Sequence, residues 1–598
     1  MSNREAPLAA AFAALLLTVF GRLLADPALI PGNFGDIYAY HYPLRHLVAS
    51  TLQAGRLPLW NPYLFAGTPL AANPQGVLFY PGSAIHYFFP LAWSFSADFF
   101  LHLLFAWLGA FLLLRKWGLD RAGAWLLAVS YAASPFLVCR VPQGIPTHLA
   151  GLSWIPWLWL LAQGSSTALW GLALALQILS GHPQFALLNL LALGLWAAIR
   201  RPSRLPALAA GAIFSLALAC GQVWPTLQFL AHSVRTQWSA GYSLGYSLRP
   251  EYLATFAYPD AFGNPSEAGF RLFPSEYFEM LTGYIGLIPL CLGAAGLSRS
   301  RAPLALLACA LFFALGQNNP AYVPIQKLLR LDFLRVPSRF MIDALLALWL
   351  AAAVGWKAFC SKRKAWLKAA LVAAGTADVL LWSLTWIFPQ TAANFLASNA
   401  PTLQKLRTPG YRFATSPEIA SANKAMLYRL PNVTGYEAFY LAPIALYTSR
   451  SEGKAAADGS RTYVRNWRTP AMERLAVRYY LEGDGTVLEN PRALELVQGS
   501  STWSLSNAER YDVLADAPTD VRFAQARYPG WKLWVDGRRT EMTEESGLFP
   551  SVHLDGEGPR RLRFVYLPSL WFLSVAISIL SLCALATYSA GGIQRWKY

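Results

Sequence analysis

The sequence predicts a mainly α-helical, polytopic membrane protein with about twelve transmembrane helices and an extracytoplasmic domain of mixed α/β and β-sandwich structure. Long apolar segments recur along the chain, and 55% of its 598 residues are hydrophobic while only 14% are charged. A soluble domain usually carries about 25% charged residues. The net charge of +17 is explained by basic loops on the cytoplasmic side of a membrane, so we expect no nucleic-acid partner.

The apolar segments that predict the transmembrane helices lie at 7–25, 95–114, 122–138, 149–163, 167–180, 184–199, 206–224, 277–298, 303–317, 339–358, 366–388 and 568–590. Every second loop between them is basic, apart from the short uncharged loop 164–166. This alternation follows the positive-inside rule and predicts cytoplasmic N- and C-termini. The first segment is too long for a signal-peptide core and lacks a small-x-small cleavage site, so we expect a retained helix.

The chain divides into a transmembrane block at 1–388, an outer domain at 389–566 and a C-terminal anchor at 567–598. The block contains a long first outer loop at 26–94. Within the outer domain, 500–566 alternates with the period-2 pattern of strands, which predicts a β-sandwich. None of the six cysteines lies in 389–566, and no CxxC pair occurs. We therefore expect neither a disulfide framework nor a zinc site.

The first outer loop carries more polar and aromatic side chains than a simple connector between two helices needs. Asp36 is its candidate catalytic residue. Burial at the membrane surface raises the pKa of a carboxyl, which favours a base that activates an acceptor hydroxyl directly or through a metal ion. The alternative role for Asp36 is an N-cap of the helical segment that follows. Tyr40, His41, Asn61 and Gln75 are predicted to bind substrate around it.

Three more candidate groups lie at the outer ends of predicted helices. His182 and Gln184 occur in LSGHPQF, where Gly and Pro free backbone groups for a polar ligand; a tight turn with a surface histidine is the alternative. Glu279 lies at the start of 277–298, where it joins the acidic site or is only solvated. Arg335 and Arg339 in LDFLRVPSRF are predicted to bind phosphate, with snorkelling to lipid headgroups as the alternative.

Several of these segments resemble the YfhO-type bacterial membrane proteins, and the similarity spans most of the chain. They are GDIYAYHYP, GRLPLWNPYLFAGTPLAANPQGVLFYP, SGHPQ, RVPSRF and YPGWKLWVDGR. That family is similar to the GT-C superfamily of integral-membrane glycosyltransferases. The resemblance implies a GT-C-like transmembrane domain in the bacterial inner membrane, a polyprenyl-phosphate sugar donor, and an outer-face active site with an acidic residue in the first outer loop.

Asp36 is the one position that matches the acidic residue implied by this resemblance. It is followed by Ile37, whereas some members of the superfamily have two adjacent acids there. A metal-binding Asp-x-Asp is also missing. We therefore assign no metal ligands, and a divalent cation, Mg²⁺ or Mn²⁺, remains only an expectation about the cofactor.

The hypothesis from the sequence is an inverting glycosyltransferase that moves a sugar from a polyprenyl-phosphate donor to an extracytoplasmic hydroxyl. The acceptor is a cell-envelope glycan, lipid or protein. A transporter or flippase of lipid-linked glycans is one rival, although such proteins usually show two similar halves and none is visible here. A non-catalytic cell-envelope assembly protein is the other rival. Replacement of Asp36 separates the classes, because only an enzyme loses activity while it stays folded.

Overall fold

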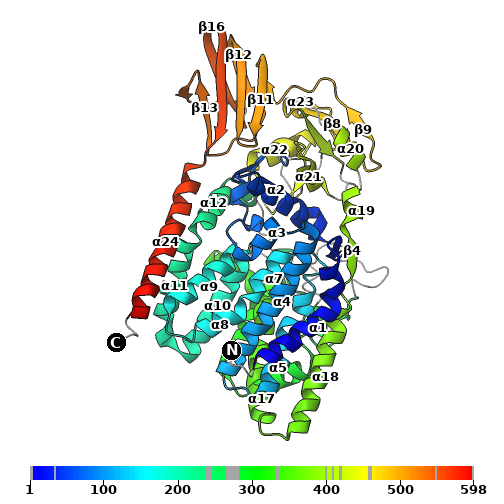
Figure 1. Cartoon of the computed structure of the whole chain (residues 1–598), viewed down its shortest axis with the longest axis vertical. Helices are drawn as coiled ribbons and strands as arrows, with labels where there is room; N and C mark the ends of the chain where they lie inside the picture. Colours follow the sequence, from blue (N-terminus) through cyan, green and yellow to red (C-terminus); the bar gives the residue numbers. More distant parts are fainter. Residues whose placement is uncertain are drawn as a thin grey trace.

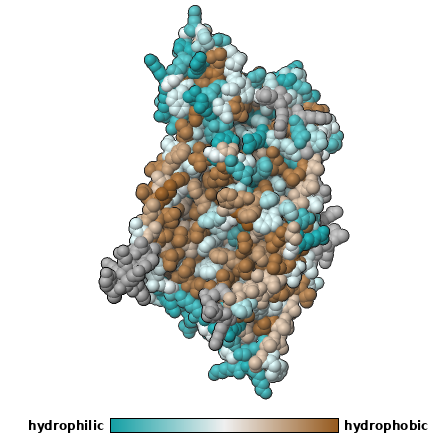
Figure 2. Space-filling model, viewed as in Figure 1, coloured by the Kyte–Doolittle hydropathy of each residue, from teal (hydrophilic) through white to brown (hydrophobic). Residues whose placement is uncertain are grey.

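The structure of the protein is a computed structural model, and the residues it describes are 5–32, 35–237, 244–263, 282–331, 336–397, 400–406, 410–416, 421–438, 440–454, 461–462, 464–545 and 548–594. A tall block of helices makes up the lower part of the molecule, and strands and short helices form a separate domain above it (Figure 1). On the face shown in Figure 2, apolar side chains predominate over the helical block, while hydrophilic side chains gather at its lower end and over the upper domain.

The helical block contains helices from the first part of the chain and one helix, α24, that follows the upper domain. They are α1 (Ala6–Ala25), α4 (Leu91–Lys116), α5 (Arg121–Ala132), α6 (Pro135–Val138), α7 (Pro146–Ser153), α8 (Ile155–Leu161), α9 (Thr167–Leu179), α10 (Pro183–Arg200), α11 (Leu205–Leu218), α12 (Cys220–Ala231), α14 (Leu287–Leu297), α15 (Arg301–Ala314), α16 (Tyr322–Leu329), α17 (Met341–Phe359), α18 (Ala365–Leu384) and α24 (Ser569–Gln594).

Among the described residues, 6 helices are long and apolar enough to cross a membrane, or up to 8 if each of two bent pairs is one span. The chain is therefore a multi-pass membrane protein, but the predicted count of about twelve spans is not confirmed. Several predicted spans are broken: 122–138 is divided into α5 and α6, and 149–163 falls on α7 and α8. A proline lies in the first turn of each of α6, α7 and α8. Because proline lacks the N–H that continues a helix, it is tolerated in the first turn and interrupts the interior.

The first outer loop is folded, and its short elements lie between the helical block and the upper domain. They are β1 (Leu29–Pro31), the π-helix η1 (Ile37–His41), α2 (Tyr42–Gln53), β2 (Trp60–Asn61), β3 (Thr68–Pro69), η2 (Leu70–Ala72), η3 (Pro74–Gly76), η4 (Pro81–Ala84) and α3 (Ile85–Phe88). Strand β1 pairs antiparallel with β4 (Pro389–Thr391), which directly follows α18. The start of the loop is thus tied to the start of the outer domain.

The outer domain begins with a mixed α/β part. Its elements after β4 are α19 (Ala392–Ala397), α20 (Ala400–Lys405), β5 (Arg412–Thr415), α21 (Ala425–Tyr428), β6 (Gly435–Tyr436), α22 (Ala442–Ser451), β7 (Arg461–Thr462), α23 (Pro470–Arg474), β8 (Val477–Leu481) and β9 (Val487–Glu489). Strand β5 runs parallel to β8, and β8 pairs antiparallel with β9.

The second part of the outer domain is one antiparallel sheet of seven strands in the described residues, rather than the predicted sandwich of two sheets. Its strands are β10 (Val497–Gln498), β11 (Thr502–Asn507), β12 (Arg510–Phe523), β13 (Trp531–Val535), β14 (Arg538–Thr540), β15 (Thr543–Glu545) and β16 (Phe549–Tyr566). Because β12 and β16 pair with each other over most of their length, the shorter strands add to this long central pair instead of forming a second layer.

One hydrophobic core joins the first outer loop to the outer domain. Trp60 is 1% exposed and its ring lies among three aromatic rings of the sheet, with centroid distances of 6.3 Å to Tyr528, 5.3 Å to Trp531 and 4.7 Å to Tyr566. Burial of aromatic side chains is among the largest single contributions to a protein core. The loop is therefore an integral part of the outer domain's core.

Trp60→Ala should destabilise the contact between the loop and the outer domain by about 3–5 kcal/mol, because it removes a fully buried aromatic ring and leaves a cavity. Thermal unfolding of the detergent-purified full chain measures the effect, and limited proteolysis shows whether the outer domain has loosened. The matched control is Trp534→Ala, because Trp534 is only half-buried on the outer sheet. Equal stability of the two variants would contradict the shared core.

Candidate functional site

Asp36 lies where the first outer loop meets both the helical block and the outer domain. It directly precedes the π-helix η1, and its backbone N–H donates to the carbonyl of Gln143 at 2.8 Å. The hydroxyl of Tyr436, on β6 of the outer domain, donates to Oδ1 of Asp36 at 3.1 Å. The Asp36 side chain makes no capping hydrogen bond to the helix that follows. The N-cap alternative is thus not what the geometry shows.

Two glycines allow the backbone around Asp36 to lie directly against the 139–145 turn. Gly35 has a φ of +87°, and a Cβ there would lie 2.3 Å from the carbonyl oxygen of Gln143. Gly144 has a φ of +69°, and its Cβ would lie 2.2 Å from the Cβ of Ile37. Only glycine fits at such positive φ values and at such close approach. The position of Asp36 is therefore set by contact between two backbones.

A buried carboxyl that the sequence analysis did not single out lies near the other end of η1. Oε2 of Glu437 accepts hydrogen bonds from the Tyr40 hydroxyl at 2.6 Å and from Nδ2 of Asn73 at 2.9 Å. Burial raises the pKa of Glu437 to about 8. A perturbed buried carboxyl beside a candidate base is typical of functional sites. The only local signal was a single acid among the aromatic residues of GYEAFY.

His41, at the C-terminal end of η1, acts electrostatically on His182, which belongs to a second group of predicted site residues. The ring of His182 lies 4.4 Å from the ring of His148, and Arg339 donates to Oε1 of Gln184. Burial and the positive charges of Arg339 and Arg235 lower the pKa of His182 well below its ordinary value, and His41 adds to this effect. The structure thus brings together predicted residues from the first loop and from the starts of α10 and α17.

The other predicted site residues are placed differently. Asn61 is 0% exposed, and its amide group bonds within the protein, to Sδ of Met426 at 3.3 Å and to the backbone N–H of Tyr63 at 3.0 Å. The backbone carbonyl of Gln75 accepts from the buried Arg45. A substrate role for Asn61 and Gln75 remains a prediction, while the structure shows both of them in contacts that shape the loop.

Two predicted residues, Glu279 and Arg335, lie outside the described residues. Metal binding is likewise left as an expectation. Within the described part of the chain, no group of three or more His, Cys, Asp or Glu residues could hold a metal ion. We assign no reaction step to a divalent cation.

A polar network that the sequence analysis missed lies below η1, at the outer end of α4. His102 Nδ1 lies 2.9 Å from Oδ1 of Asp98, and Nε2 of His102 lies 2.9 Å from the Tyr80 hydroxyl. His86 Nε2 lies 3.6 Å from Oδ2 of Asp98. Ionisable groups inside a membrane helix are costly unless they are paired. Here they pair with each other and support the loop from the membrane side.

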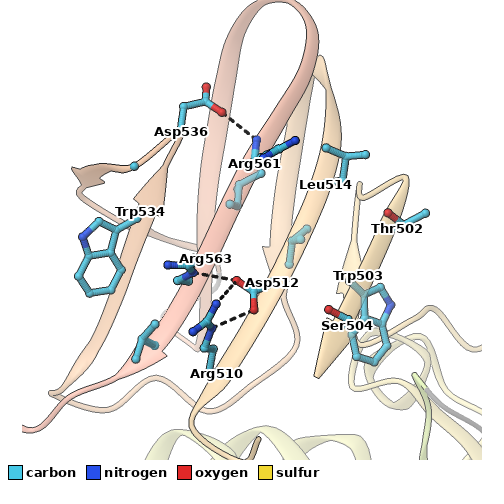
Figure 3. Close-up of a pocket in the computed structure, with 14 residues that line it drawn as sticks. Thr502, Trp503, Ser504, Arg510, Asp512, Leu514, Trp534, Asp536, Arg561 and Arg563 are labelled. Carbon is cyan, nitrogen blue, oxygen red and sulfur yellow. Dashed lines mark hydrogen bonds and ion pairs between the residues drawn. The ribbon is translucent and has the colours of Figure 1, made fainter. Parts of the chain in front are cut away.

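A broad groove lies elsewhere, on one face of the sheet (Figure 3). At its centre Arg563 donates to Oδ1 of Asp512 at 2.8 Å, and Arg510 donates to Oδ2 of the same carboxylate at 2.9 Å. The two guanidinium groups lower the pKa of Asp512 to about 2. None of the predicted site residues lines this groove, so its size does not identify it as the catalytic site.

No protein-family model and no curated protein sequence matches this chain. Similar solved structures include the arabinofuranosyltransferase AftD from Mycobacteria, which is 16% identical with a TM-score of 0.48 over 95% of this chain and 40% of that chain. ArnT from Cupriavidus metallidurans in the apo state is 14% identical with a TM-score of 0.34 over 71% of this chain and 85% of that chain.

A structure of ArnT bound to undecaprenyl phosphate is 12% identical with a TM-score of 0.30 over 72% of this chain and 86% of that chain. The chain spans about 40% of the length of the AftD chain it matches. No residue of this protein takes its role from these likenesses.

The lowered pKa of His182 predicts how stability depends on pH. The folded protein keeps this imidazole neutral, while the unfolded chain takes up a proton near its ordinary pKa of about 6.5. The stabilising contribution is therefore fully present above about pH 6.5 and is lost as the pH falls toward the folded pKa. His182→Gln should make the fall in melting temperature between about pH 7 and pH 5 shallower.

The matched control for His182→Gln is His232→Gln, because His232 is exposed on the outer side of the same block. Melting temperatures of the two variants and the unchanged protein are compared across the same pH range. An identical slope for His182→Gln and the unchanged protein would contradict a neutral, buried His182.

Proposed function

We propose that this chain is an integral-membrane glycosyltransferase that moves a sugar from a polyprenyl-phosphate-linked donor to a hydroxyl on the outer side of the membrane. The observation that supports this most is a series of contacts that links two carboxyls to a guanidinium. Tyr436 donates to Asp36, and the next residue, Glu437, accepts from Tyr40. The neighbour of Tyr40, His41, and the guanidinium of Arg339 both act on the pKa of His182. A glycosyl phosphate needs both kinds of group, a base and a phosphate ligand.

The cationic side of the site suits the donor. A guanidinium binds a phosphate group through two parallel N–H donors, and the hydrogen bond of Arg339 to Gln184 fixes its direction. A polyprenyl tail cannot leave the bilayer cheaply, because each buried CH₂ is worth about 0.8 kcal/mol. The donor phosphate therefore arrives from the side of the apolar helical block, where Arg339 lies in the 3-10 turn Pro337–Phe340 directly before α17 and His182 precedes α10.

Asp36 supplies the base for the acceptor. The acceptor hydroxyl oxygen forms a bond to the anomeric carbon as its proton passes to the Asp36 carboxylate, and the bond from that carbon to the phosphate oxygen breaks. The polyprenyl phosphate leaves as an anion held by Arg339, and direct displacement inverts the anomeric configuration. Stabilisation of the leaving charge by a fixed cation is a large contribution to such catalysis. The activated donor drives the reaction without ATP.

The proposed partners follow from this chemistry. The donor is a sugar on polyprenyl phosphate, and the acceptor is a cell-envelope glycan, lipid or protein. The proposed location is the bacterial inner membrane with cytoplasmic N- and C-termini, which places the outer domain and Asp36 on the outer face. The basic loop between α17 and α18 lies at the opposite end of the molecule from the sheet (Figure 1), as this orientation requires.

Asp36→Asn should lower transfer by at least about a hundredfold, which is the lower range for loss of a general base, while expression and melting temperature change little. Transfer is measured in membranes with radiolabelled polyprenyl-phosphate sugars and isolated envelope acceptor. The matched control is Asp26→Asn, because Asp26 is an exposed carboxylate of the same loop. Near-normal turnover of Asp36→Asn would favour the transporter or assembly reading over an enzyme with this base.

Arg339→Ala should raise the apparent KM for the donor roughly ten- to a hundredfold, because a hydrogen bond to a charged group is worth about 1.5–3 kcal/mol. Arg339→Lys should recover part of the loss, since lysine keeps the charge but not the fork. Arg249→Ala is the control, because Arg249 is an exposed arginine of another outer segment. An unchanged donor KM in Arg339→Ala would contradict phosphate binding and support the alternative, a contact of Arg339 with lipid headgroups.

A further inference from the structure

We propose that Glu437 of the outer domain is a positioning residue for the transfer reaction, because it clamps the π-helix between Asp36 and His41 against the outer domain. The effect of the clamp on transfer rests on the proposed function. The hydrogen bonds that form the clamp do not depend on it. It assigns the outer domain a direct part in the geometry of the site.

Three polar groups form a closed triangle at the clamp. The Tyr40 hydroxyl donates to Oε2 of Glu437 at 2.6 Å, and Nδ2 of Asn73 donates both to that oxygen and to the Tyr40 hydroxyl, each at 2.9 Å. The three residues are 2%, 6% and 4% exposed in the order Tyr40, Asn73 and Glu437. Away from water, each group depends on the other two for its hydrogen bonds, so removal of one leaves the others unsatisfied.

Two consecutive residues of the outer domain hold the two ends of η1. Glu437 holds Tyr40 near its C-terminal end, and Tyr436 donates to Asp36 at its N-terminal end. The rings of Tyr40 and Tyr436 also meet edge to face with centroids 5.7 Å apart. π-helical turns are rare and are found frequently at functional sites. Contacts that fix both ends of η1 would hold the candidate base, Asp36, in position.

The segment that carries the clamp is itself held by hydrogen bonds on both sides of Glu437. Asn423 is fully buried, and its side chain donates to the Tyr436 carbonyl at 2.6 Å and accepts from the Tyr436 N–H at 2.8 Å. On the other side of Glu437, the guanidinium of Arg235 donates to the carbonyl of Ala438 at 2.8 Å. Positions before and after Glu437 are thus fixed, so its carboxyl cannot follow the loop if the loop moves.

The charge state of Glu437 links the clamp to pH. The titratable and charged groups around it are Tyr40, Tyr436, Asp36 behind Tyr436, and Arg235, and no described cation forms an ion pair with it. Burial raises the pKa of Glu437 from 4.5 to about 8. The folded state therefore holds a proton that the unfolded chain has lost, and this contribution to stability is lost as the pH rises from about 4.5 through about 8. Above that pH, a buried charge without a counterion favours opening of the clamp to water.

The test uses the detergent-purified full chain with Glu437→Ala, Glu437→Gln and Tyr40→Phe, and Glu482→Gln as the control on a partly exposed glutamate of the same domain. Hydrogen–deuterium exchange of the segment 37–53 is measured first, because it does not depend on any substrate. We expect faster exchange in Glu437→Ala and Tyr40→Phe, and near-normal exchange in Glu437→Gln, whose amide oxygen still accepts from Tyr40. Unchanged exchange in Glu437→Ala would overturn the clamp.

The second readout is the pH profile of transfer from a radiolabelled polyprenyl-phosphate sugar. The unchanged protein should lose kcat/KM as the pH rises through about 8, whereas Glu437→Gln, normalised to its own value at neutral pH, should show no such alkaline limb. An alkaline limb that persists in Glu437→Gln would overturn the link between the clamp and catalysis. Absence of transfer in the unchanged protein would instead contradict the proposed function, and the exchange result would still decide the clamp.

Discussion

The burial of the first outer loop in the core of the outer domain is the constraint on which the candidate site depends. Trp60 lies among Tyr528, Trp531 and Tyr566 of the sheet. Backbone groups reinforce this contact, since the N–H of Ala526 donates to the carbonyl of Ala66 at 3.0 Å. A loop between two membrane helices would otherwise be free to move against the bilayer surface. Because the loop is packed in this core, the positions of η1 and Asp36 relative to the helical block are fixed.

The boundary between an apolar block and a water-exposed domain explains the electrostatics of the site. Burial disfavours the charged forms of two of its groups: it lowers the pKa of His182 and raises the pKa of Glu437. The polar groups of the site come from two parts of the molecule. Arg339 is at the start of a membrane helix, whereas Tyr436 and Glu437 belong to the outer domain. Such an arrangement suits a substrate whose anionic phosphate stays with the lipid and whose reacting sugar points outward.

The membrane character of the helical block could be predicted from residues alone, because apolar runs identify it. Asp36 was singled out as a carboxylate in a polar outer loop, His182 and Gln184 because Gly and Pro free backbone groups there, and Arg339 because a guanidinium binds phosphate; their roles stay predictions. The count of spans is not confirmed, and Pro135, Pro146 and Pro156 lie in the first turns of short helices within the apolar runs. The contact of the buried Asn61 amide with Met426 could not be predicted, because it joins residues 365 positions apart in the chain; the substrate role of Asn61 stays a prediction.

Hydropathy is a property of each local segment, so the amino-acid sequence alone establishes that this chain is a multi-pass membrane protein with a separate β-rich domain. Which polar groups meet is a different kind of information. Tyr436 and Asp36 are 400 residues apart in the chain, and Glu437 and Tyr40 are 397 apart. No periodicity or spacing encodes such pairs, because they form only when the outer loop and the outer domain bury a common core. The clamp on η1 therefore becomes visible only in three dimensions.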